Sequence, residues 1–244
     1  MNQTIHKIRE GVLDVIFPRH CPVCHEILKN TKWMICPECR KEIRPIREPY
    51  CRKCGKPVEE SQEYCGDCSG TERYFTEGRG IFLYNCTWKK SILRYKYAGC
   101  REYGDFYGRM LWIFGKKDIR SWRPDMIVPV PIHTAKLRVR GFNQSEYIGN
   151  RLSELSGIPV NRYLVKKIRR TASQKKLNAF ERRRNLREAF QVQERVDGRR
   201  ILLVDDVFTT GSTMDAMAQV LREHGAAEIF FLTVCIGEDK DALI

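Results

Sequence analysis

The chain has 244 residues, enough for one or two domains, and its apolar content is ordinary for a globular protein. It contains no run of about 18 apolar residues and no apolar signal-peptide segment, so we expect a cytoplasmic protein without a membrane span. Lys and Arg number 44 against 30 Asp and Glu, a formal net charge of +14. This charge favours anionic partners such as nucleic acid or phosphorylated substrates; a merely soluble basic protein is the alternative.

An N-terminal helix is expected within residues 1–20. Ile5, Ile8, Val12 and Val15 recur at helical spacing, and Pro18 would end the helix. We expect this helix to pack on the module that follows it.

Residues 21–70 contain eight of the 11 cysteines, arranged as four Cys-x-x-Cys pairs: Cys21/Cys24, Cys36/Cys39, Cys51/Cys54 and Cys65/Cys68. Each such turn directs two sulfurs to one centre, and a tetrahedral Zn²⁺ needs four. In a cytosolic chain this spacing indicates two structural zinc sites rather than disulfides. Pairing in sequence order would give ribbons at 21–39 and 51–68, each closing a short loop, and we favour it. A cross-brace, first pair with third and second with fourth, is the alternative.

Residues 69–78 are interpreted as a linker to a second domain, 78–244. Its first apolar run, 80–84, is expected to form a short antiparallel strand pair. Helices are expected at 88–97 and 103–114, followed by a strand at 126–130. Because two prolines cannot both sit in a central ladder, that strand must end near Pro129.

A basic loop is expected at residues 132–141, beyond the carboxyl end of that strand. It carries Lys136, Arg138 and Arg140, and a basic loop in this position can receive a diphosphate. A helix then extends through Ser156 and ends at Gly157.

Residues 161–187 are intensely basic, and short strands are expected on either side, at 162–165 and 189–192. This segment is interpreted as a lid over an anionic substrate or as a track for a nucleic-acid backbone, with a solvated loop as the alternative. The candidate nucleic-acid contacts are Arg169, Arg170, Arg182, Arg183 and Arg184.

The most informative stretch is 201–214. Its apolar residues 201–204 predict a buried parallel strand, with Asp205 and Asp206 where that strand ends. Residues 209–213 then turn into a helix that reaches about residue 224, and a last strand is expected at 228–235. A helix N-terminus suits a phosphate, Gly211 lets the backbone close around it, and the two carboxylates can accept hydrogen bonds from vicinal hydroxyls. The stretch is therefore shaped for a ribose 5-phosphate.

Residues 204–213, Val-Asp-Asp-Val-Phe-Thr-Thr-Gly-Ser-Thr, resemble the phosphoribosyl-diphosphate (PRPP) motif of type I phosphoribosyltransferases. The cysteine pairs, Arg140-Gly-Phe-Asn-Gln-Ser145, Arg170-Thr-Ala-Ser-Gln174 and Arg184-Asn-Leu-Arg-Glu-Ala-Phe190 accompany it in order. Together they resemble the ComF family, with its ComFC-like and GntX-like competence proteins, over nearly the whole chain.

This resemblance implies an α/β fold of the type I phosphoribosyltransferase class, a mostly parallel central sheet flanked by helices, with an N-terminal zinc-ribbon domain. It implies a protein that binds PRPP with Mg²⁺ and handles single-stranded DNA in natural competence, the process of DNA uptake, with other competence proteins as partners. The alternative is an active transferase that moves ribose 5-phosphate from PRPP to an unidentified base or amine.

The resemblance also assigns residue roles. Asp205 and Asp206 would be the catalytic pair that holds the ribose hydroxyls. The 5-phosphate and diphosphate would be bound by Val207, Thr209, Thr210, Gly211, Ser212, Thr213, Arg138, Arg140, Lys175 and Lys176. For stacking on DNA bases the candidates are Phe142, Tyr163, Phe180 and Tyr97, although core packing is expected for Tyr163 and Tyr97.

Overall fold

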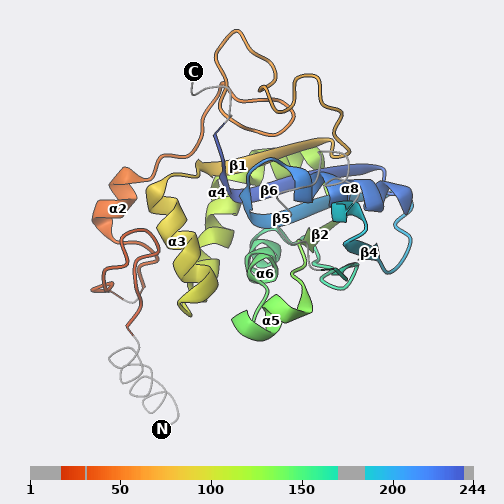
Figure 1. Ribbon diagram of the computed structural model, residues 1–244. Coiled ribbons are helices and arrows are strands. Elements are labelled where there is room, and N and C mark those ends of the chain that lie inside the picture. Colours follow the sequence, from red (N-terminus) through yellow and green to blue (C-terminus); the bar gives the residue numbers. More distant parts are fainter. Residues whose placement is uncertain (1–17, 31, 170–184, 239–244) are drawn as a thin grey trace.

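The computed structural model describes residues 18–30, 32–169 and 185–238 (Figure 1). The expected N-terminal helix lies almost entirely outside these ranges. Among the described helices, none combines the length and apolar character needed to cross a membrane.

A parallel sheet of four strands forms the centre of the molecule. The strands are β1 (Glu77–Leu83), β2 (Met126–Pro129), β5 (Arg200–Phe208) and β6 (Glu228–Ile236), in the order β1-β6-β5-β2. β5 and β6 are buried almost throughout, as near-continuous apolar runs in a parallel sheet require. The expectation that β1 belongs to an antiparallel pair is wrong, because it pairs with β6 in parallel.

Helices cover both faces of this sheet (Figure 1). On one face α4 (Tyr103–Trp122) packs on α6 (Gln144–Ser156), and α6 packs on β5. On the other face lies α8 (Ser212–Glu223). Successive side chains of β5 point to opposite faces of the sheet and so enter different cores. Leu202 and Val204 belong to the α4–α6 core, whereas Ile201 and Leu203 belong to the α8 core.

The segment between β2 and α6 is a helix, not the expected loop. This helix, α5 (Thr134–Arg140), starts at His133, whose Nδ1 accepts a hydrogen bond from the Ala135 N–H at 3.1 Å. It ends at Gly141, which has a left-handed φ of 78°. The charges that suggested a loop belong to good helix formers, which explains the error.

Two further boundaries differ from expectation. The strand expected at 162–165 is β3 (Val165–Lys167), which pairs antiparallel with β4 (Phe190–Val192). It starts later because the Asn161 side chain accepts from the Tyr163 and Leu164 amides and so forms a turn there. β5 extends to Phe208, so Asp205 and Asp206 lie within the strand rather than beyond it.

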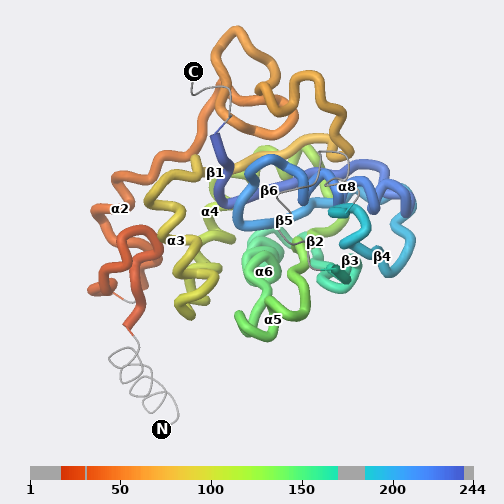
Figure 2. The backbone as a smooth tube through the Cα atoms, viewed as in Figure 1, coloured from red at the N-terminus to blue at the C-terminus, as the bar shows by residue number. Residues whose placement is uncertain are grey.

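The two cysteine-rich modules occupy different sides of the molecule. The first contains α2 (Pro37–Glu42) and lies beside α3 (Cys86–Tyr97), where Ser91 Oγ donates to the Pro22 carbonyl (Figure 2). The second lies above β1. There the backbone of Gly55, at φ 78°, approaches so closely that an added Cβ would stand 2.9 Å from Arg79 Cα.

Candidate functional site

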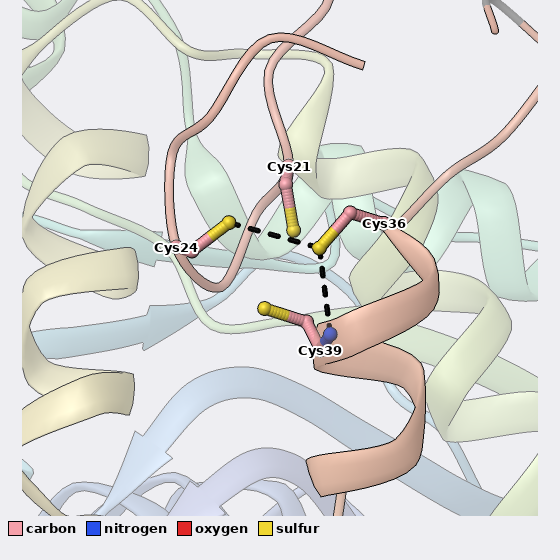
Figure 3. A group of neighbouring side chains, drawn as sticks. All are labelled: Cys21, Cys24, Cys36 and Cys39. Carbon is pink, nitrogen blue, oxygen red and sulfur yellow. Dashed lines mark hydrogen bonds between the residues drawn. The ribbon is translucent and has the colours of Figure 1, made fainter. Parts of the chain in front are cut away.

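The eight paired cysteines form two clusters, and each cluster joins consecutive pairs. Cys21, Cys24, Cys36 and Cys39 form the first (Figure 3), and Cys51, Cys54, Cys65 and Cys68 form the second. In each, the four sulfurs lie within 4.8 Å of one another. The expected pairing in sequence order is confirmed, and the cross-brace is wrong.

Both clusters fit a tetrahedral zinc ion. Zn–S bonds of about 2.3 Å place tetrahedral sulfurs about 3.8 Å apart. The Sγ–Sγ distance is 3.8 Å for Cys24 and Cys36, and 3.5 Å for Cys54 and Cys65. With four thiolates and no position left for water, each site suits a structural zinc rather than a catalytic one.

The two clusters differ in burial. Cys24 is exposed, and Cys36 and Cys39 are half-buried. All four cysteines of the second cluster are buried, and they share one apolar core with Phe208 and Met214. The second ribbon is therefore built into the core that also supports the end of β5.

The carboxylates of the PRPP-like motif are buried, and each has a neighbouring donor. Ser145 Oγ donates to Asp205 Oδ1 at 2.6 Å, and the Asp206 N–H donates to the same oxygen at 2.9 Å. Burial, reinforced by the neighbouring Asp206 charge, raises the pKa of Asp205 to about 7.

Asp206 has a cationic partner that the sequence did not reveal. Lys96, on the last turn of α3, donates to Asp206 Oδ1 at 2.8 Å and lies 2.7 Å from Oδ2. Burial disfavours the Lys96 ammonium, but the Asp206 and Asp205 charges outweigh it and raise the Lys96 pKa. The pair is separated by 110 residues, so no local pattern could have indicated it.

The start of α8 is open for an anion. Gly211 is its N-cap, with φ 77°, and no side chain caps the amides that follow. The neighbouring hydroxyls of Thr210 and Ser212 lie 2.8 Å apart. An added Cβ on Gly211 would stand 2.6 Å from the Phe208 ring, so glycine is required here by both conformation and space.

α5 carries Arg140, which lies close enough to Lys96 for the two charges to repel each other. Arg140 donates to Gln144 Oε1 and, at 3.3 Å, to the Tyr97 hydroxyl. The second predicted diphosphate contact, Arg138, lies exposed on α5. Lys175 and Lys176 lie outside the described residues.

Lys167 on β3 is a further cation near the carboxylates. Burial, followed by repulsion from Lys136, lowers its pKa, whereas Asp205 acts in the opposite direction. Lys167 lies in a run of basic residues, so the sequence alone did not single it out as a cation near Asp205.

The aromatic expectations need correction. Tyr97 and Tyr163, expected in the core, are 68% and 64% exposed, and Phe142 is buried. Arg140 lies over the Tyr97 ring at 5.0 Å, and Arg162 lies over the Tyr163 ring at 4.6 Å. Phe180 is not among the described residues.

Of the predicted nucleic-acid contacts, only Arg169 is described. It is exposed and pairs with Glu188, with an N–O distance of 2.5 Å. Arg170, Arg182, Arg183 and Arg184 fall in the segment that the structure does not describe.

Two protein families match this chain. The double zinc ribbon domain matches residues 12–69, and the phosphoribosyl transferase domain matches residues 151–243. Competence protein F of Haemophilus influenzae is 31% identical over 194 residues, which cover 70% of this chain and 83% of that protein.

Two other relatives agree with these matches. Competence protein ComFC of Streptococcus pneumoniae is 30% identical over 171 residues, 68% of this chain and 71% of that protein. The DNA utilization protein YhgH of Escherichia coli K12 is 41% identical over 112 residues, which cover 46% of this chain and 49% of that protein. The parallel sheet, its flanking helices and the cysteine clusters confirm the fold class that the sequence predicted.

Proposed function

Because this chain belongs to the ComF family of competence proteins, we propose that it binds PRPP with Mg²⁺ at the edge of its sheet and handles single-stranded DNA during natural transformation in the cytoplasm. We further propose that its units are an N-terminal helix (1–20), a double zinc ribbon (21–70) and a phosphoribosyltransferase-like domain (78–244).

The observation that carries the ligand proposal is the joint placement of the carboxylates and the α8 N-terminus. Asp205 and Asp206 lie six and five residues before Gly211, whose helix offers uncapped amides. Phosphate bound at those amides would set the ribose hydroxyls toward the carboxylates. Arg140 and Arg138 on α5 would face the diphosphate.

Magnesium would arrive with the ligand. Asp205 already accepts from Ser145 through Oδ1 and Asp206 pairs with Lys96, so each carboxylate has a partner before a metal ion binds. Mg²⁺ usually keeps water molecules and substrate phosphate oxygens as ligands, so it would be held here mainly by the bound PRPP and water. The chain's own contribution is to hold the sugar and to compensate the phosphate charge.

The charge balance favours binding over transfer. Ribosyl transfer passes through a cationic sugar, which anionic side chains stabilise. Here Lys96 compensates the Asp206 charge, and burial together with that charge raises the pKa of Asp205. This pair therefore offers little net negative charge to a developing cation, and we place transferase activity second.

Single-stranded DNA has a candidate surface of cations beside exposed aromatics. Tyr97 under Arg140 and Tyr163 under Arg162 offer ring faces on which bases can stack. The net charge of +14 supplies the long-range attraction to phosphates.

The ligand proposal is tested by calorimetric titration of PRPP with Mg²⁺, with and without a short single-stranded oligonucleotide. We expect saturable PRPP binding that Asp205→Asn weakens about tenfold, because the amide loses the charge-assisted acceptor. Absence of binding by the wild-type protein would refute the proposal. Rapid diphosphate release with any of a panel of bases, abolished by Asp205→Asn, would favour the transferase instead.

The DNA proposal is tested separately by gel shift. We expect salt-sensitive binding to single strands that survives Asp205→Asn and is weakened by Tyr163→Ser. Charge reversal at residues 182–184 should weaken it further. Salt-independent binding, or equal affinity for all variants, would count against this surface.

A further inference from the structure

The segment between the second zinc ribbon and β1 is held in place by α8 and β6. The Tyr74 N–H donates to Asp215 Oδ1 in the first turn of α8 at 2.8 Å, and Arg222 donates to the Tyr74 carbonyl at 2.6 Å. The Thr76 N–H donates to the Ile229 carbonyl at 2.6 Å. The expected linker is therefore a fixed segment that runs alongside the start of α8.

Arg73 extends from this segment to the Gly211 turn. Its Nη2 donates at 2.8 Å to the carbonyl of Asp67, a residue inside the Cys65-x-x-Cys68 zinc turn. Its Nη1 lies 3.5 Å from the position that a Cβ on Gly211 would occupy. The guanidinium also lies 6.0 Å from the Phe75 ring, in the core that the zinc cysteines share.

The donors of Arg73 are not all used. Its Nε is buried and has no hydrogen-bond partner among the described residues. A buried donor left in this state requires an explanation, and a guanidinium with spare donors is the side chain best suited to a phosphate. The carboxylate of Asp67 does not compensate it, because Asp67 pairs with the buried Lys56.

We propose that Arg73, in the segment that follows the second zinc ribbon, is a further anion-binding residue of the 209–213 loop, held there by the Cys65–Cys68 turn. This inference rests on the proposed function, because it assigns Arg73 to the same ligand. It goes further by adding a residue from outside the phosphoribosyltransferase-like domain, which acts on the phosphate monoester at the ribose 5 position and not on the diphosphate near α5. It also gives the second ribbon a part in ligand binding, because its zinc turn holds Arg73 in place.

The test compares ligands that carry one or the other phosphate group. The wild-type protein, Arg73→Gln and Arg73→Lys are titrated calorimetrically with ribose 5-phosphate, with PRPP and Mg²⁺, and with inorganic diphosphate. Arg52→Gln is the matched control, because Arg52 lies on the second zinc ribbon, but its side chain is 73% exposed and pairs with Glu63. Zinc content and thermal unfolding are measured for each variant.

Arg73→Gln is expected to weaken the binding of ribose 5-phosphate and of PRPP about tenfold, because a charge-assisted hydrogen bond is lost, and to leave diphosphate binding unchanged. Arg73→Lys keeps the charge but loses the planar donor geometry, so an intermediate loss is expected, and this variant decides the matter if Arg73→Gln does not fold. Arg52→Gln should match the wild type.

Two failures are distinguishable. If the wild-type protein binds none of the ligands, the proposed function and this inference both fall. If the wild type binds PRPP and either folded Arg73 variant binds ribose 5-phosphate with unchanged affinity, the inference alone is refuted. An equal loss for diphosphate and ribose 5-phosphate would also refute it, since Arg73 would then act on the whole site and not on one phosphate.

Discussion

At the scale of single residues, the site is organised by a cation that pairs with one of two adjacent carboxylates. Lys96 compensates Asp206 directly, and burial together with the Asp206 charge raises the pKa of Asp205. Ser145, at the start of α6, fixes the orientation of Asp205. The sequence could predict the two carboxylates from their motif, but their partners come from α3 and α6, which only the folded chain brings to β5.

Removing the cation should be costly to stability. Lys96→Met keeps the length of the side chain but leaves Asp206 buried without its counter-ion, which typically costs about 3–5 kcal/mol. Urea unfolding should show this loss, and Asp206→Asn added to Lys96→Met should recover part of it. Lys89→Met, on the exposed side of the same helix, is the control and should change stability by less than about 0.5 kcal/mol. Equal effects of Lys96→Met and Lys89→Met would contradict the assigned role.

Asp205 makes a distinct prediction for pH dependence. Its pKa is about 7 in the folded protein, above the value of about 3.9 typical of an unfolded chain. Between these values the folded state holds the proton that the unfolded state has lost, so this group's contribution to stability falls as pH rises through this window and is constant above it.

The measurement is urea unfolding of the wild type and Asp205→Asn at several pH values from 5 to 8. The variant cannot ionise at this position, so it lacks the pH dependence that Asp205 gives the wild type. As pH rises toward 7, the free energy of unfolding of the variant minus that of the wild type should increase by up to about 1.4 kcal/mol per pH unit. Other titrating groups cancel in the difference. Parallel pH curves for the two proteins would show that Asp205 is ionised throughout.

At the scale of elements, the parts with a strong local pattern were predicted well. The β5–α8 unit follows from an apolar run and a glycine turn, and α6 follows from its spacing and Gly157. β1 was given the wrong partner because an apolar run does not say which strand lies beside it.

Glycines in β1 could have corrected this. An added Cβ at Gly78 would stand 2.0 Å from the Phe231 ring, and one at Gly80 would stand 2.4 Å from Ile236 Cβ. Glycines inside a strand indicate such close approach, and here both contacts are with β6. Their presence pointed to a strand packed closely against β6, at the edge of the sheet, and not to an exposed hairpin.

Charge and aromatic content were weaker guides than periodicity. α5 was mistaken for a loop because Lys136, Arg138 and Arg140 dominate it, although none of them disfavours a helix. Tyr97 and Tyr163 were expected in the core, yet both are exposed and each has an arginine over its ring. Arg140 and Tyr97 come from different elements, whereas Arg162 and Tyr163 are neighbours at a turn. Sequence alone does not distinguish a tyrosine in such a pair from one packed in the core.

At the scale of the whole molecule, the two zinc ribbons are joined to the α/β body in different ways. The first docks on α3 and α4 through polar contacts, among them Tyr103 hydroxyl to the Cys21 carbonyl at 3.3 Å, and through partly buried apolar residues such as Val23 and Met34. The second places its four cysteines in the apolar core that contains Phe208 and much of α8. Both ribbons have two Cys-x-x-Cys pairs, so this difference appears only in the fold.

Loss of either zinc should therefore have unequal consequences. Cys36→Ser should release the first zinc, leave one zinc per chain, and lower the melting temperature moderately, because none of the four cysteines of that ribbon belongs to an apolar core of the body. Cys65→Ser should leave a buried, incomplete thiolate cluster inside the main core and should abolish cooperative unfolding of the body. Zinc analysis by atomic absorption and thermal unfolding followed by circular dichroism measure both effects, and a chelator should remove the first zinc faster, since Cys24 is exposed. Equal destabilisation by the two substitutions would contradict this prediction. It would mean that the shared apolar core does not couple the stability of the second ribbon to that of the α/β body.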